Sequence, residues 1–236
     1  MSSYKKQSLG TKGGFTLLEL LIVVSIIAIL SVALVLVLNP AETLKKSRDA
    51  QRISDLSTIK TALGLYMTST STPYLGSASA NTACKATPTT AYGTTGATVK
   101  LFYSLPTSAG TISDTTLDGS SVTTPASQSG TPSLTDGTGW IPVNFDTLTG
   151  GSPISNLPLD PVNAFATGDS VSTVSSASLI YRYACSQTPL AFEVDAQLES
   201  IAYTSSENKR TTDGGNNDNL YEVGTNLKIL GTGTDF

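Results

Sequence analysis

The fold of this chain is decided near its start by residues 15–38, which read FTLLELLIVVSIIAILSVALVLVL. Twenty of these 24 residues are apolar, and only Glu19 is charged. A helix of this length, at about 1.5 Å per residue, extends roughly 36 Å and can cross the ~30 Å hydrocarbon layer of a bilayer. The sequence therefore predicts one membrane-length helix, followed by a much more polar body.

The composition of the 236-residue chain is poor in the groups that enzymes and metal sites most often use. There is no histidine, which is the commonest general base and metal ligand, and there are only two cysteines. The net charge is −4, whereas a nucleic-acid-binding protein usually has a basic face. The composition therefore argues against an enzyme, a zinc protein and a nucleic-acid binder.

A short basic leader precedes the apolar segment and contains Lys5, Lys6 and Lys12 but no acidic residue. Two ordinary interpretations are a secretory signal cleaved after Ala33 and a plain transmembrane anchor. The apolar run is longer than the usual 7–15 residues of a secretory signal, and a carboxylate inside a membrane helix is costly and usually functional. Glu19 therefore argues against both interpretations. Lysine and arginine lie on both sides of the helix, so their count does not predict its orientation.

The junction between the leader and the apolar run, residues 14–19, reads GFTLLE. It resembles the class III signal of type IV pilins and pseudopilins. The resemblance implies cleavage by a prepilin peptidase after Gly14, on the cytoplasmic side, and N-methylation of the new terminal residue Phe15. It also implies that Glu19, together with Thr16, serves in the assembly of the helix into a filament.

The chemistry of Glu19 gives an independent argument for a role in assembly. When apolar helices leave the bilayer and pack against one another, a buried carboxylate must find a partner or become neutral. Cleavage would supply a partner, the α-amino group of Phe15 on a neighbouring copy, and the pair would fix the axial register of the two copies. The alternative is that Glu19 lies one turn inside the membrane and reaches the lipid headgroups.

Two interpretations remain open for residues 39–42, which read NPAE. They are typical of a new helix start, with Asn as the cap and Pro in the first turn, but a single helix kinked at Pro40 is the alternative. Further along, apolar residues recur at spacings of three and four from Ile53 to Tyr66. This spacing predicts an amphipathic helix.

The body that follows is rich in serine and threonine. They make up 31 of the 73 residues from Thr68 to Trp140, which predicts an irregular surface loop with short strands, for example near residues 99–103. O-glycosylation and an adhesive surface are the functional alternatives. Apolar and polar residues then alternate over residues 179–185 and 192–198, and a last strand candidate runs over residues 220–230, interrupted at Gly224. These patterns predict an antiparallel sheet.

The predicted organisation has four parts: a leader at residues 1–14, a transmembrane and polymerisation helix at 15–38, an amphipathic helix at 39–67, and a Ser/Thr-rich loop with an antiparallel β head at 68–236. The predicted class is α+β, with a long N-terminal helix packed on a small antiparallel sheet. Type IV pilins have the same architecture, so the pattern and the resemblance agree.

Two further features of the body predict sites. An extracytoplasmic location would allow a disulfide between Cys84 and Cys185, worth roughly 4–5 kcal/mol in a simple entropy model, and the alternative is two free thiols. Asp213, Asn216 and Asp218 are candidate calcium ligands, because calcium takes six to eight oxygen ligands. Major pseudopilins of type II secretion systems have a calcium loop in a similar place. The alternative is an ordinary tight turn, which requires the same residue types.

The leading functional hypothesis is a structural subunit of a type IV pilus-like surface filament. The protein would be a single-pass membrane protein before assembly and extracellular afterwards. Its expected partners are copies of itself or other pilins, the prepilin peptidase, the assembly machinery and inner-membrane lipid, and no cofactor other than calcium is expected. One alternative is a pseudopilin of a type II secretion or DNA-uptake system. Another, from a different class, is a membrane-anchored adhesin or binding module that does not polymerise.

Overall fold

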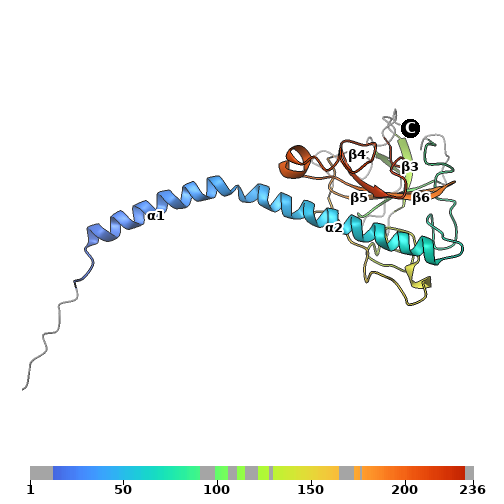
Figure 1. Ribbon diagram of the computed structural model, residues 1–236, viewed down its shortest axis with the longest axis horizontal. Helices are drawn as coiled ribbons and strands as arrows, with labels where there is room; N and C mark the ends of the chain where they lie inside the picture. The colour runs from blue at the N-terminus through green and yellow to red at the C-terminus, as the bar shows by residue number, and fades with distance from the viewer. Residues whose placement is uncertain are drawn as a thin grey trace, which may run out of the picture. The chain divides into compact units, whose positions relative to one another are not determined.

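The structure is a computed structural model that describes residues 13–90, 99–105, 111–114, 122–127, 130–164, 173–175 and 177–231 (Figure 1). The chain divides into two compact units, Met1–Thr43 and Leu44–Phe236. The second unit, called the head below, contains most of an amphipathic helix and a β-sheet.

The first unit is built on the apolar helix α1, Leu17–Leu38. Thr16 is its N-cap, and the Thr16 hydroxyl oxygen accepts a hydrogen bond from the backbone N–H of Glu19 at 3.2 Å. The helix ends at Asn39, whose backbone is left-handed with φ 39°. Asparagine tolerates this conformation better than most residues do.

A second helix, α2, begins directly after this interruption and runs from Pro40 to Ser69. The Asn39 side-chain oxygen accepts a hydrogen bond from the Glu42 N–H at 3.4 Å, and Pro40 occupies the first turn, where its missing N–H costs nothing. Of the two interpretations of residues 39–42, the new helix start is therefore confirmed.

The predicted amphipathic character of α2 is also confirmed. One face of the helix is buried in the head, and its apolar members are Leu56, Ile59, Ala62, Leu63 and Tyr66. Figure 1 shows this part of α2 running along the sheet. The spacing of these residues places them on one side of the helix, which is why a polar sequence still packs.

The sheet of the head has seven strands in the order β4-β2-β3-β1-β5-β6-β7. Their bounds are β1 Leu101–Tyr103, β2 Thr111–Asp114, β3 Val122–Ser127, β4 Thr173–Val174, β5 Tyr181–Gln187, β6 Leu190–Ala196 and β7 Tyr221–Gly224. Strands β1, β5, β6 and β7 form a four-stranded antiparallel sheet, while β3 adds to β1 in parallel. The described residues also form a 3-10 helix, Phe145–Thr147, and a π-helix, Ala202–Ser206. The predicted α+β fold, with its helix packed on an antiparallel sheet, is confirmed.

The two faces of the antiparallel sheet are both covered. Residues of β5 and β6 that face α2 join the main core, and they include Tyr181, Tyr183, Phe192 and Val194. On the opposite face, Leu101, Tyr103, Ala184 and Ala191 pack with Ile229 and Leu230 in a second apolar cluster. Charged groups on this second face are buried as well, which the alternation in the sequence did not indicate.

The prediction of a last strand over residues 220–230 is wrong beyond Gly224, where β7 ends. The residues after Gly224 form turns, and they end with Ile229 and Leu230 fully buried. The physical reason is that this apolar segment lies over the second face of the sheet and does not extend its edge.

Candidate functional site

The segment that the processing motif concerns lies just before α1. Gly13, Gly14 and Phe15 are exposed and have no regular secondary structure, and 84% of the Phe15 surface is accessible. A Cβ added at Gly13 or Gly14 would meet no atom of the described chain within 4 Å, and neither backbone is left-handed. The described part of the chain therefore gives no steric reason for glycine at position 14.

The surface of α1 is apolar on all sides. Its leucines, isoleucines and valines are 46–82% exposed where the structure describes them. The hydroxyls of Ser25 and Ser31 donate to the backbone carbonyls of Leu21 and Ile27, both at 2.7 Å, so neither needs an outside partner. Within the described residues, this is the helical region long and apolar enough to cross a membrane. Such a surface suits lipid and other apolar helices alike.

Thr16 and Glu19 have a local role that the sequence analysis did not identify. Thr16-x-x-Glu19 is the signature of a capping box, in which the N-cap hydroxyl accepts from the N–H of the third helical residue. The 3.2 Å contact from Glu19 N to Thr16 Oγ1 is that bond. The helix start at Leu17 is thus specified by the same residues that the assembly hypothesis uses. Their part in assembly stays a prediction.

In the head, α2 is anchored by a buried ionic network centred on Arg52. The Arg52 guanidinium donates to Asp160 through Nε at 2.6 Å and Nη2 at 3.0 Å, and through Nη1 to Asp49 at 2.8 Å and Glu199 at 2.6 Å. The side chains of Arg52, Asp49 and Asp160 are fully buried. Arg48 adds two further bonds to Glu199, at 2.9 and 2.7 Å.

The ionisation of this network follows from its contacts. Burial alone would raise the pKa of Glu199, but hydrogen bonds from Arg48 and Arg52 outweigh it and lower the pKa below its ordinary value. Burial likewise disfavours the charged form of Arg52, yet its hydrogen bonds to Asp160 and its other partners raise the pKa of Arg52. Both shifts favour the charged forms of Glu199 and Arg52. Sequence reasoning missed it because Asp160 and Glu199 are more than 100 positions from Arg52.

The predicted disulfide is present in the head. Cys84 and Cys185 are bonded with an S–S distance of 2.02 Å and a Cα–Cα distance of 4.7 Å. Both residues are buried in the core beneath α2. The bond ties the connection after α2 to the middle of the sheet, across 101 positions of sequence.

The three candidate calcium ligands lie in one turn-rich segment but have different surroundings. The Asp213 carboxylate accepts the N–H groups of Gly215 at 2.9 Å and Glu222 at 2.8 Å, Asn216 is half-buried, and Asp218 is exposed. Burial raises the pKa of Asp213. Among the described residues, no group of three or more Asp, Glu or Cys side chains could hold a metal ion. These contacts explain Asp213 as a turn residue, and calcium binding stays a prediction.

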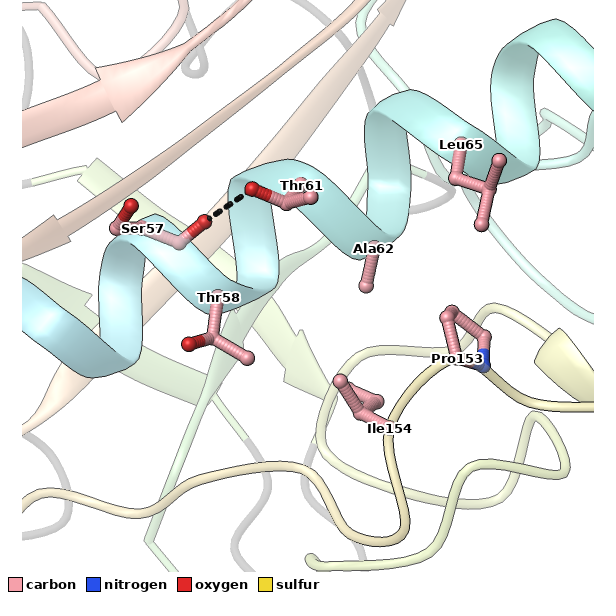
Figure 2. Close-up of a pocket in the computed structure, with 7 residues that line it drawn as sticks. All are labelled: Ser57, Thr58, Thr61, Ala62, Leu65, Pro153 and Ile154. Atoms are coloured by element: carbon pink, nitrogen blue, oxygen red, sulfur yellow. Dashed lines mark hydrogen bonds between the residues drawn. The ribbon is translucent and has the colours of Figure 1, made fainter.

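A groove of about 250 Å³ lies on the outer side of α2. Figure 2 shows Thr58 and Ala62 of the helix pointing toward Pro153 and Ile154 of the facing loop. The Thr61 hydroxyl donates to the Ser57 carbonyl oxygen at 2.8 Å, so this hydroxyl is turned back onto the helix. The described lining has no charged side chain, and the groove is smaller than most ligand pockets. It therefore offers no group for acid–base chemistry.

Comparison with known proteins gives one match. Residues 10–35 match the protein-family profile described as "Prokaryotic N-terminal methylation motif". Searches of curated proteins and of solved structures find no match. The matched residues include the predicted cleavage site and most of α1.

The match and the fold together define a class of protein. The chain carries the class III signal typical of type IV pilins and pseudopilins, and its N-terminal helical region packs through α2 on a four-stranded antiparallel sheet. The chain therefore resembles type IV pilins and pseudopilins in its prepilin processing motif and in the fold of its helix and sheet. The motif implies processing by a prepilin peptidase, and it suggests a location in the membrane first and at the surface later.

Proposed function

We propose that this chain is the structural subunit of a type IV pilus-like surface filament, cleaved after Gly14 and assembled through α1. The observation that carries the proposal is a contrast within one chain: the head has a buried apolar core, whereas the apolar side chains that the structure describes on α1 are all exposed. A helix that is apolar on all sides can leave lipid only if it packs against other apolar helices, because transfer into water would expose its whole apolar surface to the solvent. Copies of the same chain supply such helices.

The glycine before Phe15 supports processing at this position. Since no contact or backbone angle in the described chain requires glycine there, the requirement is expected to come from the peptidase that binds the segment. Replacing Gly14 with valine should leave full-length precursor in the membrane. Gly13→Val is the matched control and should be processed much more fully. Sequencing the N-terminus of the mature protein tests this directly: Phe15 is expected, whereas Leu34 would indicate ordinary secretion after Ala33.

Glu19 carries the second step, assembly. Glu19→Gln should insert into the membrane and be processed like the native chain, because glutamine preserves the size of the side chain and removes only its charge. Filament yield, measured by shearing and quantifying surface filaments, should fall about tenfold or more, since the register pair with the Phe15 amino group is lost. Thr16→Val is the matched variant for the capping role: it removes the hydroxyl that accepts from the Glu19 N–H but keeps the Glu19 carboxylate, so it measures how much capping alone contributes to filament yield. Native filament yield from Glu19→Gln would refute the proposed pairing.

The second candidate is a pseudopilin of a type II secretion or DNA-uptake system, which would share the processed helix. A strain lacking the gene separates the two: loss of surface filaments supports a pilus subunit, while loss of protein secretion or DNA uptake without loss of filaments supports a pseudopilin. If the chain is instead an adhesin that does not polymerise, the cells should form no filaments from it, and chemical cross-linking should not join the α1 helices of two copies.

A further inference from the structure

The end of the described chain closes the second face of the sheet. Ile229 and Leu230 are fully buried and pack with residues of β1, β5 and β6 on the side opposite α2. The segment of residues 225–230, called the strap below, starts directly after β7, where the Thr225 N–H donates to the Phe192 carbonyl oxygen at 3.0 Å. The strap thus supplies two of the apolar side chains that cover this face of the sheet.

Two buried side chains, one acidic and one basic, form hydrogen bonds with the peptide groups of Ile229 in the strap. One oxygen of Glu193 accepts the N–H groups of Ile229 at 2.7 Å and Leu230 at 2.8 Å. The Lys85 ammonium donates to the carbonyl oxygen of Ile229 at 2.9 Å. Lys85 and Glu193 are both fully buried. Hydrogen bonds to charged groups are among the stronger ones, and a buried charge that loses its partners is costly.

A neighbouring carboxyl group keeps this arrangement electrically balanced. Burial, together with a hydrogen bond between the side chains of Glu222 and Glu193, raises the pKa of Glu222 to about 11. Burial also raises the pKa of Glu193, while the N–H groups of Leu230 and Ile229 and the charge of Lys85 act in the opposite direction. The two carboxyls therefore retain a proton between them at neutral pH. Arg182 and Asp195 form a separate ion pair at 3.1 Å on the same face.

The position of Lys85 is set by its neighbour in the sequence, Cys84. Lys85 pairs with β5 as an extra bridge: its N–H donates to the Cys185 carbonyl oxygen at 2.8 Å, and its own carbonyl accepts from Gln187 at 2.8 Å. Successive residues in an extended segment point to opposite faces of a sheet. The Cys84 sulfur accordingly bonds Cys185 in the core beneath α2, while the Lys85 side chain reaches the strap on the far side.

We propose that Lys85 and Glu193 form a clamp on the strap, and that formation of the Cys84–Cys185 disulfide controls whether the clamp closes. The bond forms by thiol–disulfide exchange: the two thiols together lose two electrons and two protons, and the disulfide of an oxidant is reduced to a dithiol. In the reduced chain, only hydrogen bonds and the packing of Cys84 hold residues 84–86 against β5, without a covalent bond, so Lys85 is less often in place. The last face of the head would thus be completed only in an oxidising compartment. This inference does not depend on the filament role.

The test uses the full-length protein in detergent micelles and follows hydrogen exchange of individual amides with and without a thiol reductant. In the reduced protein, the amides of Ile229 and Leu230 should exchange about tenfold faster or more. The Val194 amide, in the middle of β6, should change by less than about twofold. Equal exchange at Ile229 and Leu230 in both states would overturn the proposal. So would a common loss of protection at all three amides, because the strap would then have no separate control.

A variant with the disulfide intact tests the clamp itself. Lys85→Met keeps the length and apolar stem of the side chain but removes the ammonium group, so the Ile229 and Leu230 amides should again lose protection selectively. Lys228→Met is the matched control, because Lys228 is an exposed lysine on the strap, and it should leave both amides unchanged. Native protection in Lys85→Met, or an equal loss in Lys228→Met, would show that the ammonium does not hold the strap.

Discussion

The two consecutive helices of this chain differ in how much of their apolar surface is buried within the chain. In α2, one apolar face is buried in the core of the head, and the charged residues Asp49 and Arg52 are anchored by partners in the same head. In α1, the described apolar side chains remain exposed on every side. The partners of α2 therefore lie in its own chain, whereas the described apolar side chains of α1 have no buried face. The difference separates a helix that folds with the head from a helix whose surface suits lipid or other apolar helices.

The largest expected effect concerns the anchor of α2. Arg52→Ala leaves Asp49, Asp160 and Glu199 without their shared cation, so the free energy of unfolding of the head should fall by about 3–5 kcal/mol. Denaturation of the full-length protein in mild detergent can be followed by the fluorescence of Trp140, the one tryptophan, which is buried in the head. Lys60→Ala, at an exposed position of the same helix, is the control and should change it by less than about 0.5 kcal/mol.

A pair of truncations compares the two helices directly. Leu56→Ala on α2 removes a fully buried side chain and should destabilise the head by about 2–5 kcal/mol. Ile26→Ala on α1, where the side chain is 52% exposed, should leave head stability within about 0.5 kcal/mol of the native value. The same Trp140 signal measures both. A large loss for Ile26→Ala would mean that α1 has a partner within the chain, which would contradict the distinction between the helices.

The smallest effect is a pH dependence at the edge of the α2 network. The pKa of Glu199 is lowered on folding, so its ionic contacts stabilise the head fully above its ordinary pKa of 4.5. This contribution is lost as the pH falls through the lower value of the folded state. Glu199→Gln should therefore be less stable than the native protein by about 1 kcal/mol at pH 7.

The measurement is the difference in unfolding free energy between Glu199→Gln and the native protein from pH 7 to pH 3. The two curves should begin to converge near pH 4.5 and should meet only below the lower pKa of the folded state, because a protonated Glu199 resembles glutamine. A constant difference across this range would mean that the charge of Glu199 does not contribute. Glu207→Gln, at an exposed position, is the control and should follow the native curve.

Local patterns predicted much of this molecule because the physics they report is local. The run of apolar residues identifies α1, and the spacing from Leu56 to Tyr66 identifies the buried face of α2. Asn39 before Pro40 indicated either a new helix start or a kink, and the structure has the new start. Alternation located β5 and β6 to within two residues. The capping box at Thr16 and Glu19 was also readable from the sequence, although its pattern was interpreted only as an assembly motif.

What the patterns could not predict depends on residues that are distant in sequence. Nothing near Arg52 indicates that Asp160 and Glu199 will surround it, and nothing near Glu193 indicates that Ile229 will cover it. The alternation of apolar and polar residues in β6 is typical of a strand with one face exposed to solvent, yet Glu193 and Asp195 are buried. Apolar residues 229 and 230 were assigned to a strand because periodicity alone cannot distinguish a strand from a strap that lies across one.

The sequence by itself determined that this chain has an apolar, membrane-length helix that begins with a prepilin processing motif, because hydrophobic length and a short motif do not depend on the rest of the fold. It also determined the amphipathic helix and the central strands, because helical and strand periods are properties of neighbouring residues. Only the tertiary structure decided which charges are buried together, and which segment closes the second face of the sheet. Those choices follow from the packing of segments that are 36 to 144 positions apart in these contacts, where each buried charge requires a partner that no local pattern predicts.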